Sequence, residues 1–292
     1  MKTQAKPRIY DMATPYTLPA FDGTTRAYSD GGQGVPLPGG ARTPQFFGGW
    51  PPDAKRPVIK LIEQGARMYG SSIVAFDIEG PLTHSHKVSA EQFKEAVAVK
   101  IELIAAAREA NPRAQFGVYA TIPQDQVNLA QYAEAKRVWD LKQAGKPIVG
   151  LEWWAAKYPE YENWYLKWCE VCTDCAALAK VSDFVTYVAY VQGESDNEAA
   201  DIRHDGAVAL GIEQAKKFGR PVYAYVSPYR YEHTSKGEVR HAIGEKRFEA
   251  QMRLLKSLGV NVFVWFYTNN QPLNAYETSC MKIAVKVFGR VK

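Results

Sequence analysis

The stretch SIVAFDIE at residues 72–79 decides how the rest of the chain is interpreted. It begins with a short apolar run, which is typical of a strand buried on both faces, and it ends in two acids. Alternate side chains of a strand point to opposite faces, so Ala75, Asp77 and Glu79 are predicted to share one face. The opposite face, which begins with Val74, would pack on helices. The sequence therefore predicts a buried strand with two carboxyl groups together at its carboxyl end.

Similar β-branched or aromatic runs recur along the chain, with amphipathic stretches between them. Strands are predicted at residues 8–12, 44–48, 72–79, 115–121, 147–152, 184–191, 221–226 and 261–267. This alternation is typical of βαβ units, and 292 residues, 46% of them hydrophobic, suit one barrel. No glycine-rich phosphate turn follows a strand, which disfavours a doubly wound nucleotide-binding sheet. We therefore predict an α/β fold, a single (β/α)8-like TIM barrel in regular or distorted form.

The whole chain is predicted to form one barrel domain. Its first part, residues 1–50, is rich in glycine, proline and aromatic residues, and we expect loops there around the first two strands. Two helix starts carry the capping-box pattern, at residues 89–92 and 274–277. The helices that follow are expected to cover the barrel.

The charges of the chain are mixed. The formal net charge of +5 arises from 36 basic and 31 acidic residues scattered along the sequence. Because there is no basic block that could track a phosphate backbone, we expect no nucleic-acid partner. No run of about 18 apolar residues occurs, so we expect no membrane span. The opening MKTQAKPRIYDM lacks the apolar stretch of a signal peptide, and both compartment and oligomeric state stay open.

Three of the four cysteines, Cys169, Cys172 and Cys175, recur at every third position. Such a run could indicate a metal or iron–sulfur site, but only Cys280 is left as a fourth sulfur ligand. The run lies in a helix-like stretch, where this spacing places the three thiols along one stripe. We interpret them as buried, reduced cysteines and expect neither a metal nor an organic cofactor.

Two acids on one face of a strand end point to acid catalysis. Burying Asp77 beside Glu79 is costly unless one of them holds a proton, because a neighbouring like charge raises the pKa of one. A protonated carboxylic acid is what cleavage of a glycosidic bond requires. Barrel enzymes also place their chemistry at the carboxyl ends of the strands. A salt-bridged acid pair with a purely structural role is the other interpretation.

Aromatic residues stand near the carboxyl ends of the other predicted strands. They are Tyr119, Tyr187 or Tyr190, Tyr225 and Trp265. Any one of them could simply fill the barrel. Several together around two acids are typical of the wall of a sugar subsite, where rings stack on pyranose faces. We therefore expect an oligosaccharide or polysaccharide substrate.

These motifs, taken together, resemble the hyaluronidases of the animal and venom type. That family carries a D-x-E signature after a hydrophobic run, as in IVAFDIE, and a GG-x-P turn upstream, as at residues 48–51. FGVYATIP is similar to its W-G-[YF]-Y-x-F-P strand and PVYAY to its P-V-F-A-Y. GVNVFVW resembles its G-A-x-G-[IV]-V-[IL]-W. The order and spacing of the motifs agree over roughly residues 46–267.

The resemblance implies retaining, substrate-assisted hydrolysis of a β-linked N-acetylhexosamine. Glu79 would protonate the leaving oxygen and later activate water. Asp77, with Tyr119 and Tyr225, would orient the acetamido oxygen of the substrate, which acts as the nucleophile. Trp265 would line the subsite of the cleaved sugar. No metal or organic cofactor is implied, because the substrate supplies the nucleophile.

The chain also departs from that family. Ile78 stands where the family has tryptophan between its acids, GPLTHSH follows, and the family's paired disulfide cysteines have no counterparts. The resemblance is therefore distant, and hyaluronan and another amino-sugar glycan are equally open as substrates.

Two alternatives remain. Glu152 ends the predicted strand 147–152 and could be the nucleophile of a two-carboxylate retaining mechanism with Glu79, on a glycan without N-acetyl groups. The other interpretation places Glu152 and Trp153 in an insertion that packs on the aromatic helix YENWYLKW, or in the substrate cleft. The second alternative is a barrel that binds carbohydrate without cutting it.

Overall fold

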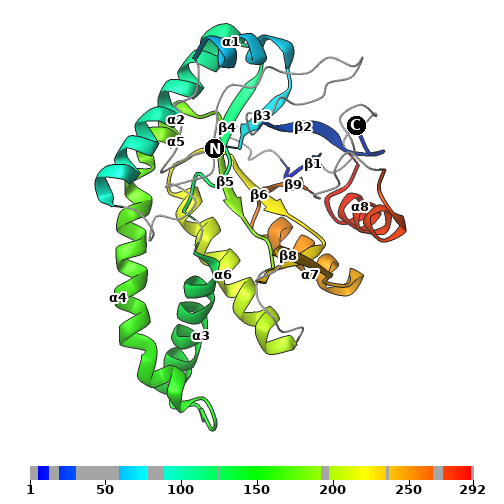
Figure 1. Cartoon of the computed structure of the whole chain (residues 1–292). Coiled ribbons are helices and arrows are strands. Elements are labelled where there is room, and N and C mark those ends of the chain that lie inside the picture. Colours follow the sequence, from blue (N-terminus) through cyan, green and yellow to red (C-terminus); the bar gives the residue numbers. More distant parts are fainter. Residues whose placement is uncertain are drawn as a thin grey trace.

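Seven parallel strands in the computed structural model form a nearly closed barrel with helices around it (Figure 1). The structure describes residues 6–12, 20–30, 59–77, 89–123, 125–191, 197–234, 237–265 and 272–290. The barrel strands are β1 (Ile9–Asp11), β2 (Thr25–Asp30), β3 (Ile73–Phe76), β4 (Gln115–Val118), β5 (Val185–Val188), β6 (Val222–Val226) and β9 (Asn261–Val264). Their order around the barrel is β4-β3-β2-β1-β9-β6-β5. The predicted TIM-barrel class is therefore confirmed, with seven strands in the described residues instead of eight.

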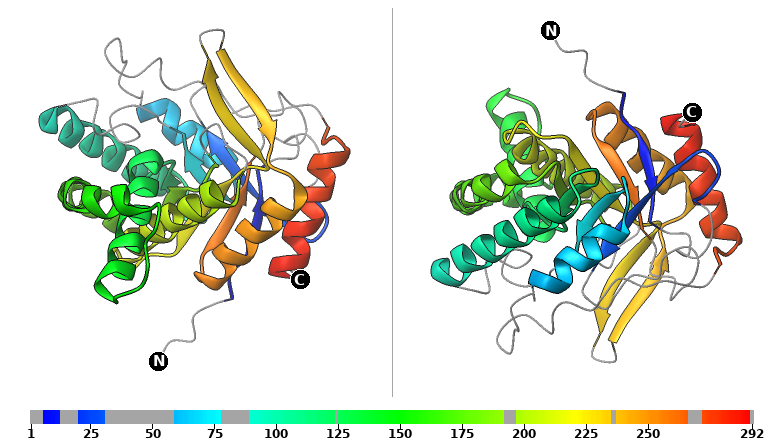
Figure 2. Two further views of the ribbon diagram at one scale, coloured as in Figure 1. Left: turned by 90° about the horizontal axis from the view of Figure 1, so that it is seen from below. Right: turned by 90° about the horizontal axis from the view of Figure 1, so that it is seen from above.

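The helices and one hairpin complete the fold. The helices are α1 (Ile59–Met68), α2 (Ala90–Ala110), α3 (Gln126–Gln143), α4 (Glu152–Asp174), α5 (Ala176–Val181), α6 (Glu198–Lys216), α7 (Glu245–Ser257) and α8 (Ala275–Phe288). Both predicted capping boxes are present at the starts of α2 and α8. An antiparallel hairpin of β7 (Tyr229–Thr234) and β8 (Gly237–Ala242) follows β6 and projects from the end of the barrel at which β6 ends (Figure 2).

The two faces of each barrel strand have different partners. Val74 and Phe76 of β3 belong to the cluster that packs on α1 and α2, whereas Ala75 between them belongs to the cluster inside the barrel. The predicted inward phase of this strand is thus confirmed at Ala75. Ala75 is paired with Gly117 of β4, and a Cβ atom on Gly117 would lie 2.4 Å from the ring of Phe184. The interior is therefore filled by side chains, as in other small barrels.

The barrel closes between β4 and β5 without a regular strand ladder. The backbone N–H of Asp183 donates to the carbonyl of Phe116 over 2.9 Å, and the Phe116 N–H donates to the Asp183 carboxylate over 2.8 Å. Thr186 Oγ1 donates to the Val118 carbonyl over 2.6 Å. Arg108 of α2 holds the second oxygen of Asp183 at 2.8 Å. Hydrogen bonds from side chains therefore help to join β4 and β5, where backbone hydrogen bonds join the other strands.

Replacing Asp183 by Ala is expected to lower the free energy of unfolding by about 1–3 kcal/mol, because the Phe116 N–H loses its acceptor. Asp183→Asn keeps an oxygen acceptor and loses only the charge that Arg108 neutralises, so a smaller loss is expected. Urea denaturation of the two variants beside the wild type measures this difference. Asp183→Ala with wild-type stability would contradict the assigned role of the carboxylate.

One strand prediction is wrong, and β2 and the β7–β8 hairpin were not predicted. The predicted strand 147–152 is wrong: it is a turn at the tip of the α3–α4 hairpin, where Val149 is 87% exposed and Gly150 has φ +77. A short apolar run cannot be assigned by periodicity alone, and here the side chains face solvent. β2 was not predicted, because it lies in a loop-like segment, and neither was the β7–β8 hairpin. The predicted strand 44–48 lies outside the described residues.

Candidate functional site

The parallel strands bring their carboxyl ends to one rim, and some of the predicted site residues lie there. Asp77 directly follows β3 and Tyr119 directly follows β4. The Tyr119 N–H donates to the carbonyl of Phe76 over 2.9 Å, which places Tyr119 beside the Asp77 segment. Trp265 directly follows β9, and its N–H donates to the carbonyl of Val226 at the end of β6 over 3.0 Å. Three of the parallel strands, β3, β4 and β9, therefore place an acid, a phenol and an indole at one end of the barrel.

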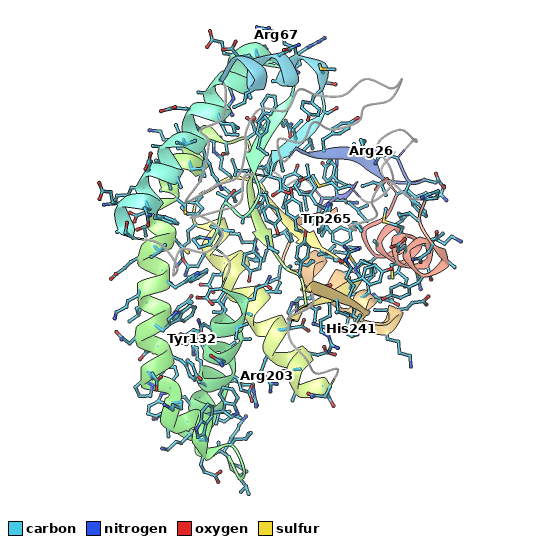
Figure 3. All side chains as sticks on the ribbon, viewed as in Figure 1. Arg26, Arg67, Tyr132, Arg203, His241 and Trp265 are labelled. Carbon is cyan, nitrogen blue, oxygen red and sulfur yellow. The ribbon has the colours of Figure 1, made fainter. Side chains whose placement is uncertain are left out.

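Four aromatic rings form the inner wall of this rim. Tyr119 and Tyr225 contact each other edge to face, with ring centroids 4.8 Å apart and an interplanar angle of 82°. Tyr190 and Trp265 stack with centroids 5.8 Å apart and an angle of 20°. All four belong to, or pack against, the cluster inside the barrel, and Trp265 is the least buried of them. Figure 3 labels Trp265 among the side chains of the barrel. A partly exposed indole over buried phenols is suited to stacking on a sugar ring.

Asp77 follows the end of β3, where alternation from Ala75 predicts an inward side chain, and its side chain is partly buried. Its Oδ1 atom is shielded from solvent. The predicted general acid, Glu79, lies outside the described residues, as does Ile78 between the two acids. The proximity of the two carboxyl groups and the raised pKa of one of them therefore stay predictions.

The turn after Tyr119 has an unusual backbone conformation. Ala120 has φ +50, in the left-handed region that residues with a Cβ atom rarely adopt, and its side chain is fully buried. The next residue is tightly held: the Thr121 N–H donates to Thr186 Oγ1 over 3.1 Å, and Thr121 Oγ1 donates to the Val118 carbonyl over 2.9 Å. Such a conformation persists only where the surrounding structure fixes it. The turn thereby fixes where Tyr119 stands at the rim.

Three helices hold the segment that carries Tyr190. Gln126 of α3 and Gln251 of α7 donate to the two carbonyl groups that precede Tyr190. His204 of α6 places Nε2 3.1 Å from the Tyr190 carbonyl. Arg247 donates to Nδ1 of the same imidazole over 2.9 Å, so Nε2 carries the hydrogen and donates to the carbonyl. These buried polar residues were not predicted as part of the site.

Tyr187 lies on the face of β5 that points away from the barrel interior, toward the helices. It is fully buried among the helix-facing residues, and its hydroxyl donates to the Ala207 carbonyl of α6 over 3.3 Å. A Cβ atom on Gly211 would lie 2.1 Å from its ring, so α6 approaches it closely. Of the two tyrosines predicted as alternatives, the structure places Tyr190 at the rim and Tyr187 in the helix layer.

Glu152 and Trp153 are not brought to the rim. They begin α4 at the tip of the α3–α4 hairpin, which extends away from the barrel at the lower left of Figure 1. Trp153 is 55% exposed and contacts Trp154, which in turn lies 6.4 Å from Tyr161 of the aromatic helix. The strand that would have aimed Glu152 at the site is a turn, so the structure does not place this carboxylate for a role as nucleophile beside Asp77.

The four cysteines are free thiols. Cys172 and Cys175 are buried between α4 and its neighbours, and burial raises the pKa of Cys175 to about 12. Among the described residues, no group of three or more His, Cys, Asp or Glu side chains is arranged to hold a metal ion. No helix in the described part of the chain has the length and apolar character needed to cross a membrane.

Comparisons with known proteins find likeness in structure and not in sequence. No protein-family model matches the chain. No curated protein sequence matches it either. Bee venom hyaluronidase is similar over 95% of this chain and 95% of its own, with a TM-score of 0.51 and 11% identity. The structure of bee venom hyaluronidase in complex with a hyaluronic acid tetramer is similar over 98% of this chain and 97% of its own, with a TM-score of 0.49 and 11% identity. A family 1 β-glucosidase from Thermotoga maritima is similar over 82% of this chain and 70% of its own, with a TM-score of 0.36 and 12% identity. The chain thus shares the barrel fold of the bee venom enzyme.

Proposed function

We propose that this protein is a glycoside hydrolase whose active site is the rim at the carboxyl ends of the strands. The observation that carries the proposal is the convergence of Asp77, Tyr119, Tyr190, Tyr225 and Trp265 from five strands at that rim. An acid beside a wall of rings, one of them partly exposed, is suited to a sugar substrate. The resemblance of fold to a hyaluronidase agrees with this proposal.

The proposed reaction is retaining, substrate-assisted hydrolysis of a glycan that contains β-linked N-acetylhexosamine. Glu79 is proposed as the acid that protonates the leaving oxygen and then as the base that activates water. Asp77 would hold the acetamido group, with Tyr119 and Tyr225 beside it, so that the acetamido oxygen attacks the anomeric carbon. The intermediate is positively charged, and a carboxylate at Asp77 stabilises it. Trp265 would form one wall of the subsite.

A panel of glycans and chromogenic hexosaminides tests this function. Turnover is expected on β-linked N-acetylhexosamine substrates and not on the matching sugars without the N-acetyl group. N-acetylglucosamine thiazoline is expected to inhibit competitively, because it imitates the cyclised intermediate. Glycan binding without turnover would identify a carbohydrate-binding barrel instead. Hydrolysis of sugars that lack N-acetyl groups would replace the substrate-assisted mechanism with one that uses a protein nucleophile.

A further inference from the structure

A second cavity opens at the opposite end of the barrel from the proposed active site. Its lining includes the first residues of five barrel strands together with β1, so it lies at the amino ends of the strands. The strand residues in its wall are Tyr10, Thr25, Ile73, Gln115, Val222 and Asn261. Its volume is about 660 Å³, within the range of about 300–1,000 Å³ that is usual for small-molecule sites.

The cavity wall is cationic. Five basic side chains line it, Lys6, Arg8, Arg26, Lys216 and Arg220, and among the described residues no acidic side chain does. These residues come from three separate segments of the sequence, and the fold brings the segments together. Only Arg26 is close to a carboxylate, that of Asp11 at 3.6 Å; in the part of the chain that the structure describes, the other four form no ion pair. A concave site with one sign of charge concentrates ligands of the opposite sign.

The inner end of the cavity is formed by phenols. Tyr10 and Tyr223 are buried, with ring centroids 5.3 Å apart. Burial raises the pKa of the Tyr223 hydroxyl and the nearby Arg8 acts in the opposite sense, so this hydroxyl stays protonated at neutral pH. Arg220 also donates to the carbonyl of Lys180, which limits the positions that its guanidinium can take. The cavity thus offers phenol hydroxyl groups at one end and guanidinium and ammonium groups around them.

From this arrangement we propose that the cavity binds a small molecule that carries phosphate or sulfate groups. Four of the cationic side chains have no ion-pair partner among the described residues, which is more positive charge than one carboxylate group of a ligand would balance. Guanidinium groups form bidentate hydrogen bonds with the oxygens of phosphate and sulfate. The volume fits a ligand no larger than a nucleotide or a substituted sugar. The five cations line one cavity of small-molecule size, which favours a small ligand over a polymeric nucleic acid.

Calorimetric titration of the whole chain in a buffer without phosphate or sulfate tests the proposal. Two probes distinguish the sources of the anionic group: inorganic pyrophosphate and N-acetylglucosamine 6-sulfate. At least one of them is expected to bind with a stoichiometry of one, and binding should weaken as salt increases. The double variant Arg8→Gln/Arg220→Gln is expected to weaken binding at least tenfold, because two charged hydrogen bonds are lost.

A matched control removes the same charge elsewhere. Lys94→Gln/Lys167→Gln changes two exposed lysines on α2 and α4 and is expected to bind as the wild type does. Tyr223→Phe removes one hydroxyl from the inner end of the cavity and should weaken binding without changing charge. The proposal is overturned if neither probe binds, or if the control double variant loses as much affinity as the cavity double variant. Binding at the proposed active site would not depend on Arg8 and Arg220, so a loss of binding in the cavity double variant reports on this cavity and not on the proposed enzymatic activity.

Discussion

Glu79→Gln is expected to reduce glycan turnover by about a hundredfold or more, which is the scale of general acid–base catalysis. The amide has the shape of the carboxyl group but cannot donate a proton to the leaving oxygen, so substrate binding should persist while kcat falls. Steady-state kinetics on the best substrate of the panel measure the change. The rate of the wild type should also fall as the pH rises above the pKa of Glu79, because only the protonated form can act as the acid. This limb of the pH profile should be absent from the variant.

The matched control for this experiment is Glu152→Gln, the same substitution on a carboxylate at the tip of the α3–α4 hairpin. It should leave turnover close to the wild-type value. Unchanged thermal unfolding of Glu79→Gln shows that the loss is chemical. A Glu79→Gln protein with nearly full activity would remove Glu79 from the role of general acid.

Asp77→Asn is expected to lower turnover by about a hundredfold, the loss that follows removal of one group that stabilises charge in the transition state. In the proposed mechanism the carboxylate stabilises the positive charge of the cyclised acetamide, which a neutral amide would not do. Affinity for the thiazoline inhibitor should fall in parallel, since that compound carries the same ring. Kinetics and inhibitor titration on the variant give both values.

The opposite pattern would establish the other mechanism. In that case Glu152→Gln would abolish turnover, and mass spectrometry would find a covalent glycosyl adduct on Glu152. Asp77→Asn would then retain its activity on sugars without an N-acetyl group. The distance that the structure places between Glu152 and the rim makes this the less favoured outcome.

Much of the barrel was predictable because its strands are short, apolar and regularly separated by helices. β3, β4, β5, β6 and β9 all fall within predicted strands. The error at residues 147–152 arose because PIVGLE has the composition of a strand while its position, at a helix-hairpin tip, is set by tertiary structure. β2, TRAYSD, could not be predicted because polar residues outnumber apolar ones in it.

The residues at the rim could be predicted from the ends of the strands and from the alternation of side chains along them, but no further. Alternation along a strand separates Tyr187 from Tyr190 only when the end of the strand is known, and β5 ends at Val188. The residues that hold Tyr190 come from three helices distant in sequence, so no local pattern reveals them. Glutamine on a buried helix position, as at Gln126 and Gln251, is the one signal that could have indicated them, because a buried amide needs a partner.

The closure between β4 and β5 also bears on how this barrel could change during evolution. The connection between these strands contains α3, α4 and α5 and is the longest excursion from the barrel in the described chain. It begins and ends at β4 and β5, the two strands that are not joined by a continuous backbone hydrogen-bond ladder. Insertions and deletions there would alter the excursion while leaving the six paired strand boundaries intact. Tyr119 and Tyr190 stand on either side of this closure. Changes in the length of the excursion would therefore alter the spacing of these two tyrosines at the proposed active site without rebuilding the barrel.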